Sequence, residues 1–223
     1  MSLVKDINWF KNQFKTEMNS AIAGTPFTPD LLTAIAVQET GYIWSVLYNN
    51  GLTVEEVLKN CVGDTLEAPQ GRGAFPLDKD DLLSVAGGDE MFDIAHDALV
   101  SMAAYIDSYQ EDASIPDAFC HGFGIFQYDI QFFPDNPDFF LKKLWYNFDE
   151  CLKLAIQELD DALNRVYGSV TALTDDEMVY VAIAYNQGSV DTDGDFRQGY
   201  HNEDEDKYYG EYIWEYLQLS KTV

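Results

Sequence analysis

The chain has 223 residues, which is enough for one sizeable hydrophobic core without a disulfide or metal to staple it. Its hydrophobic share of 47% excludes disorder, and no apolar run approaches the ~20 residues that span a bilayer. Lys and Arg number 13 against 39 Asp and Glu, so the formal net charge of -26 excludes nucleic acids and anionic membranes as partners. We expect one domain over residues 1–223, with a solvated acidic surface and no membrane insertion.

The N-terminal segment predicts a helix that packs on the core. Apolar residues recur there at helical spacing up to Gly24, where the helix should end. The stripe comprises Ile7, Phe10, Phe14, Met18 and Ile22.

The next segment, from Thr28 to Asn50, predicts a second helix, which carries the main candidate functional residue, Glu39. Thr28, Pro29 and Asp30 form a helix start, because the hydroxyl caps free N–H groups and the acid lies at the positive end of the helix dipole. Glu39 continues the apolar stripe of this helix. Burial favours the neutral form of a lone carboxyl, as a general acid requires. In the alternative interpretation, Glu39 ends the stripe and reaches water.

Residues 51–88 predict a short helix in TVEEVLKN and then a long Gly-, Pro- and Asp-rich loop, of the kind that forms a cleft wall. Asp89 is expected to cap a buried helix that runs to Ile106 and carries His96 as an ordinary helix residue. Residues 115–137 then predict a turn-rich passage, in which Gly122 and Gly124 permit close backbone approach.

Three helices are expected in the last part of the chain. The first runs from Asn136 to about Arg165, and the second is opened by a capping box at residues 174–177 and ends at Gly188. The acidic DTDGD segment, residues 191–195, lacks the EF-hand pattern and is interpreted as a solvated loop. Residues 207–219 form the closing, aromatic-rich helix. The fold class is therefore mainly α, with little or no β.

The cysteines leave their pairing open. Cys61, Cys120 and Cys151 are too few for a disulfide scaffold and lack metal-ligand spacing. One bridge with one thiol and three thiols are both compatible with the sequence. We expect no metal site and no cofactor.

Three motifs resemble the goose-type lysozyme and soluble lytic transglycosylase family. Residues 36–41, AVQETG, are similar to the family's Ala-x-x-Glu-Ser segment, and residues 122–129, GFGIFQYD, to its Gly-Leu-Met-Gln segment in the goose-type form. Residues 184–188, AYNQG, are similar to Ala-Tyr-Asn-x-Gly. Tyr208 and Tyr209 in the closing helix resemble a family tyrosine. Most of residues 52–116 lies outside the resemblance and is expected to be a loop-rich insertion in a lysozyme-like domain.

The resemblance implies that Glu39 is the general acid and base for cleavage of β-1,4 bonds in peptidoglycan. It implies substrate contacts at Gly124, Ile125, Gln127, Tyr185, Asn186 and Tyr208. The amides of Gln127 and Asn186 could instead satisfy loop backbone groups, and Tyr185 could belong to the core.

Two reaction outcomes remain open, and the goose-type resemblance favours hydrolysis. Attack by the muramyl 6-hydroxyl would leave a 1,6-anhydro end, whereas a carboxylate that positions water would give hydrolysis with inversion. Asp129, and Asp117 near the place of a second acid, are the candidates for that carboxylate, although Asp129 could equally be a turn or cap acid.

Other functions and the route to the substrate are also open. The acidic charge suggests a chitinase- or chitosanase-like glycosidase as an alternative, and a third is an inactive glycan-binding module of a phage or secretion apparatus. Residues 1–15 lack the apolar core of a signal peptide. We expect action in the periplasm or cell wall after non-classical, phage or secretion-system delivery, or a leader outside this sequence.

Overall fold

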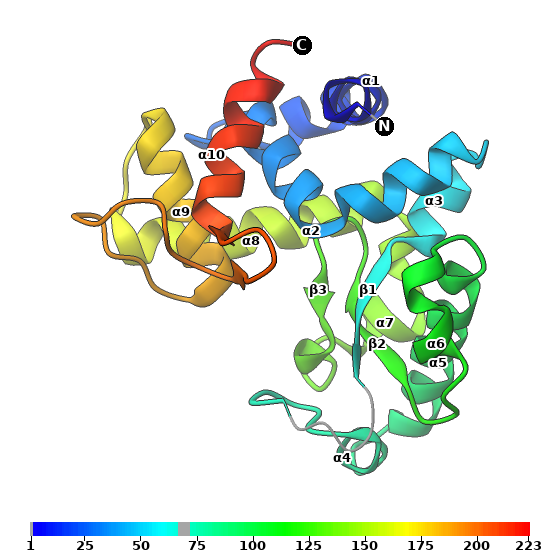
Figure 1. Ribbon diagram of the computed structural model, residues 1–223. Coiled ribbons are helices and arrows are strands. Elements are labelled where there is room, and N and C mark those ends of the chain that lie inside the picture. Colours follow the sequence, from blue (N-terminus) through cyan, green and yellow to red (C-terminus); the bar gives the residue numbers. More distant parts are fainter. Residues whose placement is uncertain (1, 67–71) are drawn as a thin grey trace. The chain divides into compact units, whose positions relative to one another are not determined.

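The computed structural model describes residues 2–66 and 72–223. It is mainly helical, as expected, and its described residues form two small sheets (Figure 1). The chain divides into two compact units, residues 1–41 with 152–223 and residues 42–151. The unit boundaries fall within the helices α2 (Pro29–Asn49) and α8 (Phe148–Val166). No helix in the described part of the chain is both long and apolar enough to cross a membrane.

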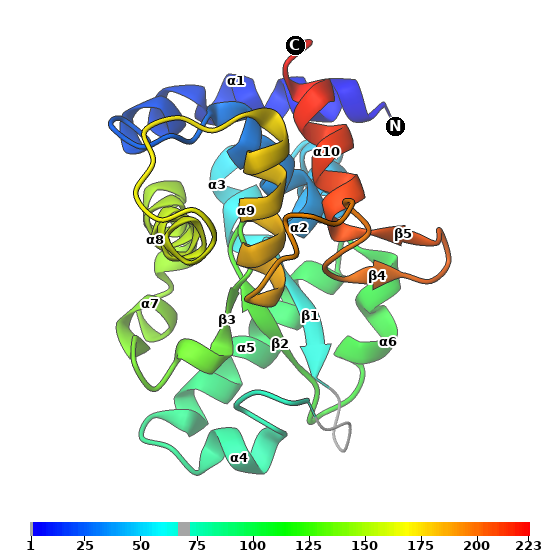
Figure 2. The same ribbon diagram turned by 90° about the vertical axis from the view of Figure 1, so that its left-hand side faces the viewer.

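The first unit is built from helices whose sequence signals were clear. Helix α1 (Leu3–Ala21) buries the predicted stripe, and α9 (Asp175–Gln187) begins with the predicted capping box of Thr174 and Glu177. Gly188 ends α9 with a φ of 84°, in the left-handed region that favours glycine. Helix α10 (Tyr209–Ser220) packs against α9, and Figure 2 shows the two side by side.

A buried lysine ties three helices of the first unit together. Lys11 Nζ on α1 donates hydrogen bonds to Asp30 Oδ1 at 2.8 Å, to the Ser220 carbonyl at 2.7 Å and to Val223 O at 2.6 Å. Because each donor finds an acceptor, the cost of burying the ammonium is offset, and α1, α2 and α10 are held together.

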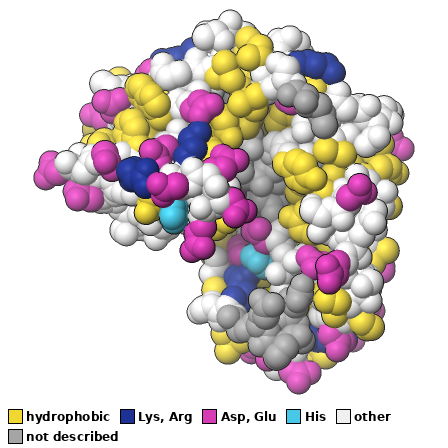
Figure 3. Space-filling view, in the orientation of Figure 1, with side chains coloured by type: hydrophobic (Ala, Val, Ile, Leu, Met, Phe, Trp, Pro, Cys, Tyr) yellow, Lys and Arg dark blue, Asp and Glu magenta, His cyan; other side chains and the backbone are white. Residues whose placement is uncertain are grey.

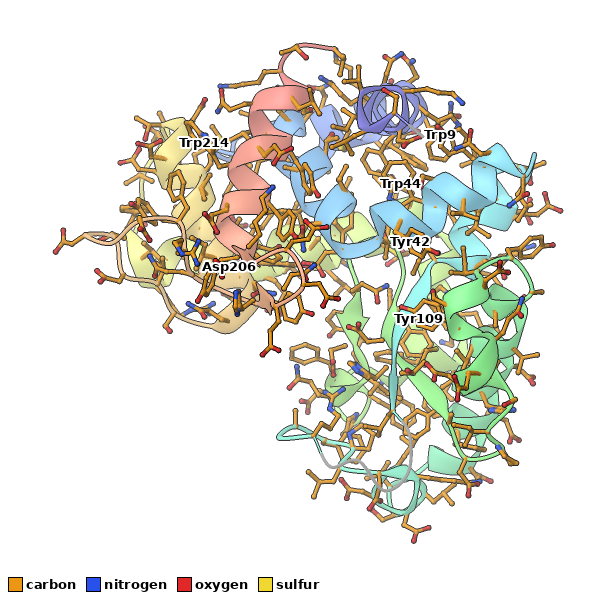
Figure 4. The ribbon with its side chains drawn as sticks, in the orientation of Figure 1. Trp9, Tyr42, Trp44, Tyr109, Asp206 and Trp214 are labelled. Atoms are coloured by element: carbon orange, nitrogen blue, oxygen red, sulfur yellow. The ribbon has the colours of Figure 1, made fainter. Side chains whose placement is uncertain are left out.

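A short hairpin precedes α10. Strands β4 (His201–Asn202) and β5 (Lys207–Tyr208) are antiparallel, and Asp206 lies in their connection (Figure 4). The predicted closing helix therefore begins two residues later than expected, since Lys207 and Tyr208 pair with β4. Trp214 on α10 contacts the ring of Phe196 at a centroid distance of 5.4 Å, which packs this residue of the preceding loop against the helix.

The second unit contains a three-stranded antiparallel sheet in the order β1-β2-β3. Strand β1 (Val62–Leu66) pairs with β2 (Phe119–Phe123), which pairs with β3 (Tyr128–Asp129). Helix α5 (Gly88–Ala103) packs along this sheet (Figure 1). The sequence had predicted loop and turn for these strands. That prediction was wrong, because β1 and β2 are stabilised by pairing with each other rather than by local signals.

The remaining elements of the second unit are short. Helix α3 (Val54–Asn60) confirms the helix predicted in TVEEVLKN, with a capping box of Thr53 and Glu56. The described part of residues 52–116 also contains α4 (Lys79–Leu83), η1 (Asp107–Tyr109) and α6 (Gln110–Ala113). Part of the predicted cleft-wall loop, residues 67–71, lies outside the described residues. After β3 come η2 (Ile130–Phe132), α7 (Pro137–Leu141) and η3 (Leu144–Tyr146).

Two helix boundaries differ from the predictions. Asp89 does not cap α5 but lies in its first turn, because Gly87, with a φ of 76°, takes the N-cap position. The helix expected from Asn136 to Arg165 is divided into α7, η3 and α8. Lys143 adopts a positive φ of 53°, which an α-helix does not accommodate, and this interrupts the helix.

Candidate functional site

Glu39 lies on α2 within the first unit and is half-buried. Its Oε1 accepts a hydrogen bond of 2.9 Å from the hydroxyl of Tyr209, the first residue of α10. The carboxyl is therefore held by a side chain from a distant part of the chain.

Tyr209 is suited to act as a permanent donor to this carboxyl. Its side chain is part of the core, with only 1% exposure. Burial raises the pKa of Tyr209 well above its usual range, and the nearby Glu39 and Tyr185 raise it further, since each would repel a phenolate. Tyr209 consequently stays protonated at any ordinary working pH, and its O–H donates to Glu39.

The other predicted residues of the first unit have different surroundings. Tyr185 is half-buried on α9 and interacts electrostatically with Tyr209. Asn186 is exposed, and its Oδ1 accepts a hydrogen bond of 3.0 Å from the backbone N–H of Tyr200. Tyr208 stacks on His201 with ring centroids 4.3 Å apart. The structure thus brings Glu39, Tyr185 and Tyr209 together, while Asn186 supports the following loop and Tyr208 the hairpin.

In the second unit, the GFGIFQYD motif, residues 122–129, comprises the end of β2, the turn that follows and β3. Gln127 adopts a positive φ of 52° and donates from Nε2 to the Gly124 carbonyl at 2.9 Å. A Cβ at Gly122 would lie 2.1 Å from Gln127 Oε1, and one at Gly63 would lie 2.7 Å from it. The glycines therefore let the amide lie against β1 and β2. The Ile125 side chain is buried.

Asp129 is tightly bound within the same unit. Its Oδ1 accepts from Arg72 Nη2 at 2.6 Å and from the Gln131 N–H at 2.7 Å, and its Oδ2 lies 3.1 Å from His121 Nδ1. Burial alone would raise the pKa of this carboxyl, but the hydrogen bonds from His121, Arg72 and the Gln131 N–H outweigh burial and lower it. Asp129 is an ionised carboxylate that also caps η2.

Asp117 has a different partner from those of Asp129. It pairs with Lys79 at 2.5 Å, and its side chain is 56% exposed. Among the described residues, no group of three or more His, Cys, Asp or Glu side chains could hold a metal ion. The three cysteines are all buried free thiols, and burial raises the pKa of each.

Comparison with protein-family models, with curated proteins and with solved structures finds no match. The candidate site therefore rests on its residues alone. Sequence reasoning selected Tyr208 rather than Tyr209 from two adjacent tyrosines, and it missed Arg72 and His121. Basic residues are scarce in a chain with a net charge of -26, which draws attention to Arg72. Scarcity alone does not show which carboxylate Arg72 binds.

Proposed function

We propose that this chain cleaves β-1,4 bonds of peptidoglycan, with Glu39 as the general acid and then the base. The observation that carries the proposal is the hydrogen bond from buried Tyr209 to Glu39 Oε1 at 2.9 Å. A general acid must be held at a defined angle to the oxygen that it protonates, and a donor fixed in a core supplies that orientation. The lysozyme-like fold and the glycan-cleaving activity are parts of this one proposal.

In the proposed reaction, Glu39 gives its proton to the glycosidic oxygen as the bond from that oxygen to C1 breaks. The muramyl 6-hydroxyl oxygen then bonds to C1, and its proton returns to the Glu39 carboxylate. The contacts of Asp129 favour this 1,6-anhydro outcome over hydrolysis. A carboxylate with a lowered pKa that is already bound by Arg72, His121 and a backbone N–H is a weak acceptor for a proton from water.

The first test replaces the acid. Glu39→Gln keeps the size and hydrogen bonding of the side chain but removes the transferable proton, so lysis of purified sacculi should fall by roughly 10²–10⁴-fold. Glu90→Gln, an exposed acid on α5, is the matched control and should retain full activity. Undiminished lysis by Glu39→Gln, with an unchanged melting temperature, would remove the assignment.

Mass spectrometry of the released muropeptides tests the outcome. The proposal expects 1,6-anhydro ends, and reducing ends would show hydrolysis instead. Glycan affinity without any product from the wild-type chain would indicate a binding module rather than an enzyme.

A second candidate substrate is a deacetylated glycan such as chitosan. The formal charge of -26 favours it, since acidic side chains, which are spread over the face drawn in Figure 3, attract amines. Digestion of chitosan oligomers in preference to sacculi would select this candidate.

A further inference from the structure

Tyr200 combines an exposed ring with a fixed backbone in the first unit. Its side chain is 63% exposed. Its N–H donates to Asn186 Oδ1 at 3.0 Å, and its carbonyl accepts from the Tyr209 N–H at 2.8 Å. Both polar backbone groups of Tyr200 are therefore used, so the base of this side chain is held in place.

The chain beside Tyr200 also packs tightly on Tyr209. Gly199 has a φ of 87°, and a Cβ at this position would lie 2.7 Å from the Cβ of Tyr209. Only glycine fits such a close approach. Tyr209 thus holds Glu39 with its hydroxyl and Tyr200 with its backbone, so the exposed ring is anchored to the residue that orients the proposed acid.

The residues that follow Tyr200 in the chain are also held in place, by the pairing of the hairpin. His201 pairs with Tyr208 in the hairpin, and its Nε2 lies 3.0 Å from Asp206 Oδ1. Asp206 also binds Arg197 at 3.0 Å, and its place in the hairpin is labelled in Figure 4. The turn of this hairpin, NEDED, is acidic. A phosphate or other anion would be repelled here, whereas an uncharged sugar would not.

We propose that Tyr200 is a sugar-stacking residue, which packs its ring against the C–H face of an N-acetylhexosamine unit of the glycan. The inference rests on the proposed function, since it names a further contact of the same substrate. The face of an aromatic ring carries partial negative charge and attracts the weakly positive C–H groups of a pyranose. A ring on a fixed backbone loses little conformational entropy when it binds, which favours affinity.

Binding without turnover tests this role. In the Glu39→Gln background, titration with a hexamer of N-acetylglucosamine should give a Kd about tenfold weaker when Tyr200→Ala is added, from the loss of one aromatic contact. Tyr200→Phe keeps the ring and should bind as the background does. Tyr105→Ala is the control for loss of an exposed tyrosine, since Tyr105 is 41% exposed and lies in the second unit.

The outcomes separate this inference from the proposed function. An affinity of Tyr200→Ala within twofold of the background would overturn the inference, as would a Tyr200→Phe affinity as weak as that of Tyr200→Ala or no binding of the hexamer. Melting temperatures check folding, and Tyr200→Trp, which restores a ring, should bind at least as well as the background. Lysis by Glu39→Gln at the wild-type rate would refute the proposed acid while leaving the Kd comparison intact.

Discussion

Glu39 in the first unit and Asp129 in the second are both half-buried carboxyls, but they are held by different partners. Glu39 accepts from the neutral hydroxyl of Tyr209, whereas Asp129 is bound by the guanidinium of Arg72, by His121 and by a backbone N–H. Burial acts to raise the pKa of Asp129, but the hydrogen bonds from His121, Arg72 and the Gln131 N–H, together with the charge of Arg72, lower it. This difference suggests that Asp129 is a structural anion and that Glu39 is the better candidate for proton transfer.

Among these predictions, Arg72→Met should have the largest effect on the free energy of unfolding. The variant leaves Asp129 charged and without its guanidinium partner, with His121 and the Gln131 N–H still bound, so the free energy of unfolding should fall by about 3 kcal/mol. The Arg72 and Asp129 side chains are 15% and 24% exposed, so solvent screens the pair only weakly. Urea unfolding, monitored by hydrogen exchange of the amides in β1, β2 and β3, measures the loss of stability.

Arg197→Met is the matched control for a lost arginine–aspartate pair. Arg197 binds Asp206, but these side chains are 42% and 73% exposed, so little change in stability is expected. Equal losses from the two arginine variants would mean that burial does not distinguish the pairs.

Tyr209→Phe should have a smaller effect on stability and a specific effect on activity. The ring stays packed, so loss of the hydrogen bond should cost about 1–2 kcal/mol. Because Glu39 loses its fixed donor, the proposed lytic activity should fall by about tenfold. Tyr212→Phe removes a similar bond of 2.7 Å, from Tyr212 to Glu205, and should keep activity. Equal activity of the two variants would deny Tyr209 a positioning role.

The pH dependence of stability should also differ between the two units, with a smaller effect than the substitutions above. Asp129 has a lowered folded-state pKa, so its contribution is complete above its unfolded pKa of about 3.9 and is lost as the pH falls through the folded value. Tyr209 has a raised folded-state pKa, so its contribution is complete below its unfolded pKa of about 10 and declines as the pH rises further.

The buried thiols extend the alkaline effect to the second unit. Their folded-state pKa values are raised, so stability there should begin to decline above the unfolded thiol pKa of about 8.5, before the tyrosines of the first unit respond. Hydrogen exchange measured between about pH 8 and 10, roughly the interval between the unfolded pKa values of a thiol and a tyrosine, tests this order. Earlier opening of α9 and α10 than of the sheet would contradict it.

The sequence predicted those parts of the fold that depend on neighbours in the chain. The short helix in TVEEVLKN, the capping box at Thr174 and the stripe of α1 are confirmed, because each arises from contacts within a few residues. Strands β1 and β2 were missed because their partners lie far apart in sequence, as in the pairing of Val62 with Phe123.

The same reason limits what could be predicted of the candidate site. Glu39 was identified from its place on the apolar stripe of a helix, and Tyr209 was grouped with Tyr208 through the resemblance. Only the fold decides between two adjacent tyrosines, since the chosen one must end in the core. Arg72 binds Asp129 across 57 residues, and no periodic pattern marks that pairing.

The discontinuous first unit also has a consequence for biosynthesis. The hydrogen bond between Tyr209 and Glu39 joins residues 170 apart, and residues 42–151 form the other unit between them. At a ribosomal rate of roughly 5–20 residues per second, about 10–30 s pass between the synthesis of the two partners. The second unit is complete on the nascent chain well before the first, so the arrangement proposed to cut the cell wall is assembled only after Tyr209 has been synthesised.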